Sequence, residues 1–175
     1  MAAAVRVVVV DDDAMMLASV SRMLSRQGYD VLPASGPHQA LEIVRTPPPV
    51  QLILSDLAMP EMRGTQLVSE VFRLSPGTAA LLMTGDLASL PDVPQGVAVI
   101  RKPFSTQELI FAVQSTLARW AELCAVLGEL REQNKRLDPN SERQLRRASK
   151  HGNVYMIPVD DAFEGPVISA KSGCS

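Results

Sequence analysis

Carboxylates follow apolar runs at two places in this sequence. Asp11 and Asp12 come directly after the valine-rich run 5–10, and Asp56 closes the apolar segment 50–56. Neighbouring carboxylates repel one another, so a group of them needs either solvent or a cation around it. Hard divalent cations such as Mg²⁺ take oxygen ligands of this kind. These three side chains are therefore candidate Mg²⁺ ligands, and an Asp carboxylate can also serve as a nucleophile.

Two further polar residues close apolar segments farther along the chain. Thr84 ends the segment 78–84, and Lys102 follows 97–101. A lysine ammonium and a metal ion could together neutralise an incoming phosphoryl group, and a hydroxyl could hydrogen-bond one of its oxygens. Phosphoryl transfer depends mainly on such positioning and charge stabilisation. The chain therefore holds the side chains for this chemistry, provided that the fold brings them together.

Short apolar segments alternate with helical patterns over the first 120 residues. Five strands are predicted, at 5–10, 29–34, 50–56, 78–85 and 97–103. Four helices are predicted among them, at 16–27, 38–45, 64–76 and 106–120. This alternation is typical of an α/β fold with a parallel sheet covered on both faces. Ligands of such sheets bind at the carboxyl ends of the strands, so we expect the polar residues to share one rim.

The interval between the fourth and fifth predicted strands breaks this rhythm. Residues 85–96 should form a helix, but Pro91 and Pro94 leave room for only about one and a half turns. A short fourth helix is therefore expected there.

Four motifs in order resemble the receiver domain of two-component response regulators. They are "VVVVDDDAMM", "LILSDLAMPEMRG", "LLMTGD" and "VIRKPF". Each motif alone is weak, but four in register over residues 1–118 make a specific signal. The resemblance implies a flavodoxin-like, doubly wound, five-stranded parallel sheet. It also implies that the domain takes a phosphoryl group from a histidine kinase or a phosphotransfer protein and needs Mg²⁺.

The resemblance also assigns roles to individual residues. Asp56 matches the phosphoacceptor, and Asp11 and Asp12 match the acidic pair that binds Mg²⁺ together with Asp56. The main-chain carbonyl of Ala58 falls where the family has a further metal ligand. Gly64 matches the glycine that lets the loop after the acceptor turn into the next helix.

The same likeness covers the last two strand ends. Thr84 matches the switch hydroxyl, and Lys102 matches the family's lysine, whose bond to Pro103 is then expected to be cis. One departure is Val99, which stands where the family usually has a switch Tyr or Phe. A second is the short interval 85–96. We therefore predict that phosphorylation is sensed mainly through Thr84 and the loop 85–96.

Composition and charge limit the remaining possibilities. The 175 residues carry a net charge of −2, which fits one domain with an appendage. Cys124 and Cys174 are far apart and show no zinc or disulfide spacing. The apolar run at the N-terminus is too short to span a membrane, so a cytoplasmic protein without a membrane segment is expected.

A seven-residue repeat continues past the predicted domain. One position holds Val113, Trp120, Leu127 and Asn134, and the other holds Thr116, Leu123, Leu130 and Leu137. The first of these is heptad position a and the second is position d. Leucine at d with a single Asn at a is typical of a parallel two-stranded coiled coil. Residues 119–138 are therefore predicted to form a helical stalk that makes the protein a homodimer, and residues 139–175 a short helix and an irregular tail.

The segment 131–150 has seven basic and three acidic residues. It could contact nucleic-acid phosphates. It lacks aromatic residues for stacking and any reading motif, so a solvated helix face is the favoured interpretation and nucleic acid is not expected as a partner.

Three functions remain open. The leading one is a phosphoacceptor switch that catalyses only its own phosphorylation and dephosphorylation and is not otherwise an enzyme. A degenerate receiver that acts as a constitutive scaffold is the first alternative. The second is an Asp-nucleophile phosphohydrolase, although Ala58 stands where that chemistry usually has an acid/base carboxylate. The acidic residues could also be solvated strand ends, with Asp13 capping the first helix.

Overall fold

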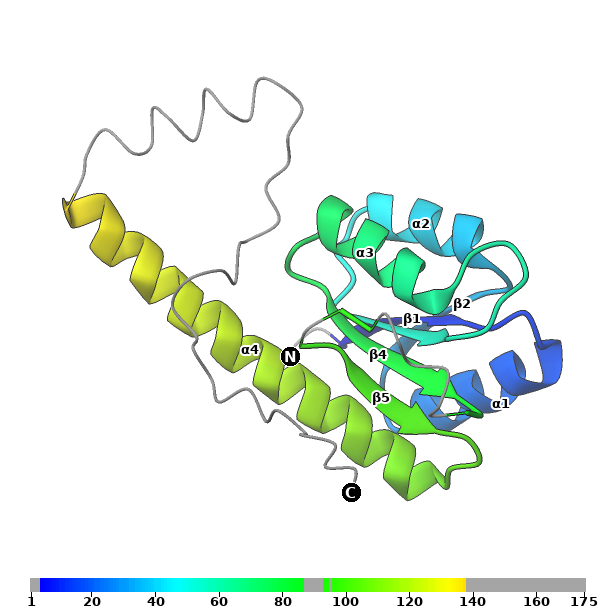
Figure 1. The fold of residues 1–175 in the computed structure, drawn as a ribbon. Helices are drawn as coiled ribbons and strands as arrows, with labels where there is room; N and C mark the ends of the chain where they lie inside the picture. Colours follow the sequence, from blue (N-terminus) through cyan, green and yellow to red (C-terminus); the bar gives the residue numbers. More distant parts are fainter. Residues whose placement is uncertain (1–3, 87–92, 95, 138–175) are drawn as a thin grey trace, which may run out of the picture. The chain divides into compact units, whose positions relative to one another are not determined.

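One parallel sheet forms the centre of the domain (Figure 1). The computed structural model describes residues 4–86, 93, 94 and 96–137, and of residues 131–137 only the backbone. Five strands pair in the order β2-β1-β3-β4-β5, and every pairing is parallel. They are β1 (Arg6–Val10), β2 (Asp30–Ala34), β3 (Leu52–Asp56), β4 (Ala79–Thr84) and β5 (Ala98–Arg101). The predicted flavodoxin-like α/β fold is confirmed.

Helices cover both faces of this sheet. The structure gives α1 (Ala14–Ser25), α2 (Pro37–Arg45), α3 (Gly64–Leu74) and α4 (Thr106–Leu137). Figure 1 shows α2 and α3 over one face and α1 and α4 over the other. This doubly wound arrangement is the one that alternating strands and helices predict.

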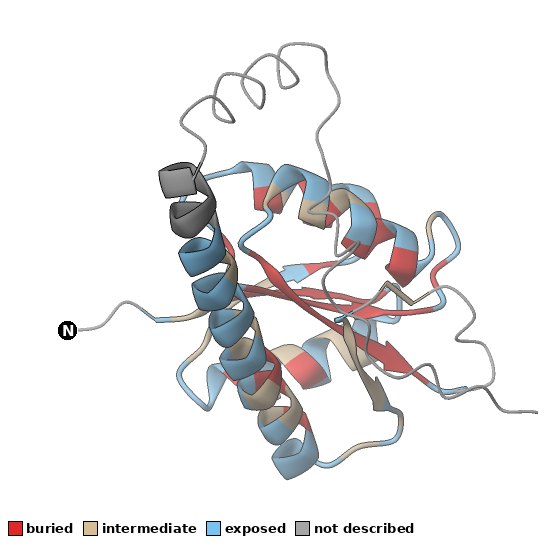
Figure 2. Ribbon diagram, turned by 60° about the vertical axis from the view of Figure 1, so that its left-hand side comes forward, coloured by how far each residue is buried: buried red, intermediate tan, exposed pale blue. Residues whose placement is uncertain are grey.

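Alternate strand residues supply the two halves of the core. Val8 and Ile53 point to the α2 and α3 side, where Leu67, Val68 and Val71 of α3 pack on them. The opposite half contains Val7, Val9, Leu52 and Leu54 with Leu24 of α1 and Leu109 of α4. β3 and β4 are buried along their whole length (Figure 2). Burial on both faces explains why these strands read as continuous apolar runs.

Local hydrogen bonds fix the starts of α1 and α4. The Asp13 carboxylate accepts hydrogen bonds from the main-chain N–H groups of Met15 and Met16, at 2.8 and 3.3 Å. At the start of α4, the Ser105 N–H and hydroxyl both donate to the Glu108 carboxylate, and the Glu108 N–H donates back to the hydroxyl. This reciprocal capping box satisfies main-chain donors that have no partner within the helix.

α4 is one continuous helix of 32 residues, and its two halves have different surroundings. Leu109, Val113 and Thr116 are buried in the first half. In the second half, Leu123, Val126 and Leu130 are 42, 52 and 53% exposed (Figure 2). No break in the helix marks the predicted domain boundary at residue 118.

This difference corrects the predicted coiled-coil seam. Val113 and Thr116 occupy seam positions of the repeat, but both are buried in this chain's own domain. Trp120 is half-buried, and its ring stacks on Phe72 of α3 with a centroid distance of 5.3 Å and an interplanar angle of 13°. A seam between two chains can therefore begin only near Leu123.

Some predictions concern residues outside the described ranges. They include the short helix and tail at 139–175 and most of the predicted helix at 85–96. Within the described part, the segment Thr106–Leu130 is long and apolar enough to cross a membrane by length and composition alone. One such helix is weak evidence for a membrane span. Leu109 and Val113 of this segment pack in the domain core, although only 17% of its most apolar window is buried.

Candidate functional site

Three strand ends bring a lysine and two aspartates together. Asp11 follows β1, Asp56 ends β3 and Lys102 follows β5. The Lys102 ammonium donates to Asp11 Oδ2 at 2.9 Å and to Asp56 Oδ1 at 2.5 Å. These residues are 91 and 46 positions from Lys102 in the sequence. The parallel sheet places them together because the carboxyl ends of its strands share one edge.

The bridged carboxylates are buried. Asp11 is 2% exposed and Asp56 is 8% exposed, while Lys102 is half-buried. Burial alone would lower the pKa of Lys102. Hydrogen bonds to Asp56 and Asp11 and the charges of both carboxylates together outweigh this, so the pKa of Lys102 is raised above its usual value. Lys102 is therefore a fixed positive charge at the rim.

Main-chain N–H groups orient the remaining carboxylate oxygens. Asp11 Oδ1 accepts a hydrogen bond from the Asp13 N–H at 2.9 Å, and Asp56 Oδ2 accepts one from the Ala58 N–H at 2.7 Å. Each oxygen of the two buried carboxylates thus has one donor. A carboxylate oxygen has two lone pairs, so each keeps capacity for a second partner.

The predicted Mg²⁺ ligands fit the cation by chemistry. Asp11, Asp12, Asp56 and the Ala58 carbonyl offer only oxygen, which Mg²⁺ takes together with several waters. One ammonium between two buried carboxylates also leaves an excess of negative charge that a cation would offset. Within the described residues, however, no three His, Cys, Asp or Glu side chains lie close enough together to hold a metal ion. The metal-binding role of these residues stays a prediction.

Asp12 differs from Asp11 and Asp56 in its exposure to solvent. It is exposed and borders a groove of about 350 Å³ between three loops at this edge of the sheet. His38 and Glu61 also line this groove, and His38 Nε2 is 3.8 Å from Glu61 Oε2. Both side chains are largely exposed, so this pair contributes little to stability.

The Thr84 hydroxyl is hydrogen-bonded to Asp86, at the start of the next loop. It donates to the Asp86 carbonyl at 2.8 Å and accepts from the Asp86 N–H at 3.1 Å. Thr84 is joined to Lys102 through the main chain, because the Lys102 N–H donates to the Thr84 carbonyl at 2.7 Å. Since the hydroxyl has one proton, it must leave the Asp86 carbonyl before it can donate to a phosphoryl oxygen.

Gly64 lies directly against the main chain of Asp56. A Cβ atom at this position would be 2.2 Å from the Asp56 carbonyl oxygen and 3.0 Å from Leu82 Cδ2. Any other residue would therefore displace the acceptor or the start of α3. The resemblance identified this glycine as a turn residue, whereas the structure shows that close approach is what requires it.

Ser55 was not among the predicted site residues, although it lies next to Asp56. Its buried hydroxyl donates to the Asp56 carbonyl oxygen at 2.8 Å. Ser55 is the one hydroxyl residue in the segment 50–55, which could have drawn attention to it. The Lys102–Pro103 bond is cis, as expected.

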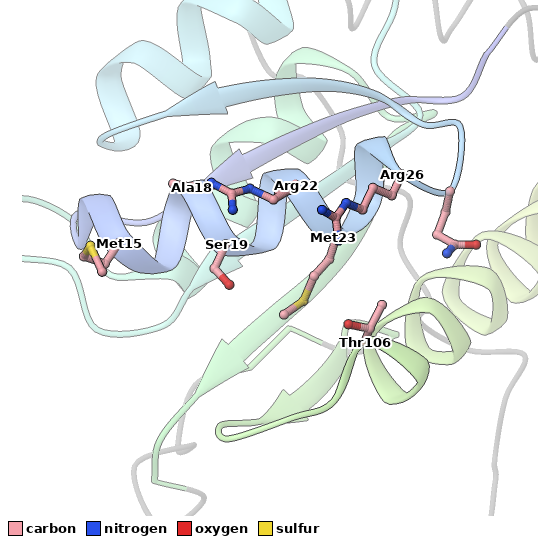
Figure 3. Close-up of a pocket in the computed structure, with 8 residues that line it drawn as sticks. Met15, Ala18, Ser19, Arg22, Met23, Arg26 and Thr106 are labelled. Atoms are coloured by element: carbon pink, nitrogen blue, oxygen red, sulfur yellow. The ribbon is translucent and has the colours of Figure 1, made fainter.

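A second groove, of about 580 Å³, lies between α1 and the start of α4 (Figure 3). Its lining includes Met15, Arg22, Met23 and Arg26 of α1 and Thr106 of α4. It contains neither Asp56 nor Lys102, so it is distinct from the predicted phosphoacceptor site.

Comparison with known protein families identifies the family of this chain. A family model described as the response regulator receiver domain matches residues 7–114. The chain belongs to this family. The predicted identity of the receiver domain is therefore confirmed.

Several relatives of this receiver are known. "Transcriptional regulatory protein PdtaR" of Mycobacterium tuberculosis is 28% identical over 168 residues, which cover 91% of this chain and 78% of the relative. "DNA-binding response regulator MtrA" of Mycobacterium leprae is 34% identical over 119 residues, which cover 65% of this chain and 52% of the relative. Similarity to MtrA thus spans about half of that protein.

Solved structures agree with the fold. The chemotaxis protein CheY4 of Vibrio cholerae has a TM-score of 0.59 and 29% identity, covering 65% of this receiver chain and 99% of that one. A CheY-like receiver domain protein of Methanospirillum hungatei has a TM-score of 0.59 and 28% identity, covering 69% and 98%.

Proposed function

We propose that this receiver accepts a phosphoryl group on Asp56 and uses it to switch a protein–protein interaction or its dimer state. A histidine kinase or a phosphotransfer protein would supply the phosphoryl group, in the cytoplasm. The observation that supports this most is the Lys102 ammonium, which bridges Asp11 and Asp56 at the carboxyl edge of the sheet. A buried nucleophile beside a fixed positive charge is suited to phosphoryl transfer.

Asp56 is the nucleophile in this proposal. One of its carboxylate oxygens forms the bond to phosphorus while the bond from phosphorus to the donor's imidazole nitrogen breaks. The leaving imidazole keeps the electron pair of that bond and takes a proton from solvent. The product is an acyl phosphate on Asp56.

The surrounding residues hold and neutralise the transferred group. Lys102 supplies positive charge to a phosphoryl oxygen, and the Ala58 N–H, already 2.7 Å from Asp56 Oδ2, is a further donor at the site. Asp11, Asp12, Asp56 and the Ala58 carbonyl would hold Mg²⁺. When bound, this ion supplies further positive charge to the phosphoryl oxygens.

We further propose that the protein is not an enzyme toward other substrates. Ala58 cannot act as the acid/base group that an Asp-nucleophile phosphohydrolase usually has two residues after its nucleophile. The bridged Asp11–Lys102–Asp56 arrangement also favours a working phosphoacceptor over a degenerate scaffold.

Incubation with Mg²⁺ and acetyl phosphate, followed by intact mass measurement, tests this function. We expect an adduct of one phosphoryl group that is absent from Asp56→Asn. Asp30→Asn is the matched control, because Asp30 is an exposed aspartate at the opposite end of the sheet. Turnover of phosphate esters would favour the phosphohydrolase, and the absence of any adduct would favour the scaffold.

The second half of α4 supports a homodimer. Leu123, Val126, Leu127 and Leu130 fall at i, i+3, i+4 and i+7, which places them on one helix face. Three of these side chains are exposed and Leu127 is half-buried. A contiguous apolar stripe on an exposed helix face is typical of an interaction surface, and the Leu and Asn pattern fits a second parallel copy.

The relatives' printed names point to regulation of transcription. PdtaR is called a transcriptional regulatory protein, and MtrA a DNA-binding response regulator. This chain spans 52% of MtrA, so DNA binding is not part of the proposal. We propose instead that its output is contact with another protein or a change in its dimer.

A further inference from the structure

Gly64, the first residue of α3, packs directly against Asp56, the proposed phosphoacceptor. Gly64 abuts the Asp56 carbonyl oxygen so closely that a Cβ atom would lie 2.2 Å away. The loop before α3 is held as well, because the Ala58 N–H donates to Asp56 Oδ2 and the Gly64 N–H donates to the Leu57 carbonyl at 3.0 Å. Any rearrangement of Asp56 therefore acts on the start of α3 from two sides.

The body of α3 is packed as one piece. Thr65, Leu67, Val68 and Val71 are all buried. The helix has 11 residues, which gives a length of about 16 Å at ~1.5 Å per residue. Close-packed elements shift as units rather than deform, so a displacement at Gly64 reaches the far end of the helix.

The far end of α3 contacts the helix that continues into the stalk. Phe72, in the last turn, stacks on Trp120 of α4 with ring centroids 5.3 Å apart. The Trp120 indole N–H donates to the Gly77 carbonyl at 3.0 Å, in the loop between α3 and β4. Trp120 is the last residue of α4 with such contacts before the exposed stripe that begins at Leu123.

We propose that α3 carries the phosphorylation state of Asp56 to the stalk, and that the Phe72–Trp120 stack is the contact through which it acts. The proposal rests on the proposed function, because it requires a phosphoryl group on Asp56. Phosphorylation takes negative charge from one Asp56 oxygen and draws Lys102 and the Ala58 N–H toward the new phosphoryl oxygens. The loop 57–63 and Gly64 then move together, and Phe72 changes its position against Trp120.

This route needs no aromatic residue at position 99. Val99 packs on the α2 and α3 side of the core. The usual switch through an aromatic residue at this position is therefore missing, whereas Phe72 and Trp120 supply an aromatic pair elsewhere. The route runs through other residues than the predicted response of Thr84 and the loop 85–96.

Trp120 is the only tryptophan of the chain, which makes the test direct. The full chain is treated with Mg²⁺ and acetyl phosphate, the adduct is verified by intact mass, and tryptophan emission and acrylamide quenching are measured. We expect both to change on phosphorylation of the natural protein and to stay constant in Asp56→Asn. An adduct with unchanged Trp120 fluorescence would overturn the inference. Absence of the adduct would instead contradict the proposed function, and the inference that rests on it would then fail as well.

Variants at Phe72 test whether its contact with Trp120 passes the phosphorylation state to α4 or only holds α4 in place. Amide exchange of residues 117–130 is compared with and without the phosphoryl group. Phe72→Leu keeps an apolar side chain but removes the stack, and we expect the phosphorylation-dependent change to be lost while the adduct still forms. Phe72→Tyr should show the phosphorylation-dependent change in amide exchange again. Leu74→Ala, at an exposed neighbouring position, should keep that change. A full response in Phe72→Leu would contradict the proposal. If Phe72→Leu does not fold, the fluorescence of the natural protein still decides.

Discussion

The Lys102 ammonium lies 2.5 Å from Asp56 Oδ1, and the same nitrogen lies 2.9 Å from Asp11 Oδ2. A single cation thus holds together two carboxylates at the ends of the first and third strands. Because both carboxylates are buried, this charge is the feature on which the chemistry of the rim depends.

Removal of the Lys102 charge should slow phosphorylation. Lys102→Met keeps much of the side-chain volume but leaves two buried carboxylates without their counter-charge. We expect the rate of adduct formation with acetyl phosphate to fall by about 10²–10³-fold, as when one preorganised donor to a developing charge is lost. Arg101→Met, at the exposed neighbouring residue, is the control and should leave the rate nearly unchanged. Equal rates in both variants would exclude a role for Lys102.

A side chain at position 64 should damage both stability and phosphorylation. Gly64→Ala places a Cβ atom against the Asp56 carbonyl, and overpacking of this kind costs about 1–3 kcal/mol. Urea unfolding and the rate of adduct formation measure the two effects. Gly128→Ala is the matched control, because nothing lies within 4 Å of its Cβ position on α4. That change should stabilise the helix by about 1 kcal/mol.

The residues in these two predictions differ in how well the sequence alone predicts their place in the site. It was enough to place Asp11, Asp56 and Lys102 on one rim, because an apolar run that ends on a polar residue marks the carboxyl end of a buried strand. The contact of Gly64 with the Asp56 carbonyl is different. It depends on how closely α3 approaches β3, and no local pattern records that distance.

Trp120 shows a second limit. The heptad pattern assigned it to a seam between two chains, but it stacks on Phe72 of the same chain. A helix that packs on its own domain and a helix that packs on a partner repeat their apolar residues at nearly the same period. Periodicity alone therefore cannot tell where the domain ends and a stalk begins.

Acid should weaken the cap of α4 through Glu108. Hydrogen bonds from the Ser105 N–H and hydroxyl lower the pKa of Glu108 below its usual value. Its contribution to stability is therefore complete above the pKa of the unfolded chain, and it is lost as pH falls through the lower folded value. Urea unfolding should show the natural protein to be more stable than Glu108→Gln at neutral pH, with the difference shrinking in acid. A difference independent of pH would contradict this assignment.

The stalk should dimerise through its exposed stripe. Leu123→Asp puts a charge at the first free seam position, and we expect sedimentation velocity to show a shift from dimer to monomer. Phe111→Asp is the control, because Phe111 is also exposed on α4 but lies outside the stripe. A monomeric natural protein, or two variants with the same sedimentation, would rule out this interface.

The loop after Thr84 should respond to phosphorylation. The Thr84 hydroxyl must exchange its bond to the Asp86 carbonyl for one to a phosphoryl oxygen, which releases the start of the loop 85–96. Amide exchange in that loop should therefore change when a phosphoryl mimic is added. Thr84→Val removes the hydroxyl and should abolish the change. Identical exchange with and without the mimic would show that Thr84 is not the sensor.

The site of phosphorylation is the most direct measurement of all. Treatment of the phosphorylated chain with borohydride reduces an acyl phosphate on aspartate to an alcohol, which converts that residue to homoserine and can be located by peptide mass spectrometry. We expect homoserine at position 56 and at no other aspartate, with none formed when acetyl phosphate or Mg²⁺ is left out. Homoserine at Asp11 or Asp12, or none anywhere after full incubation, would contradict this expectation.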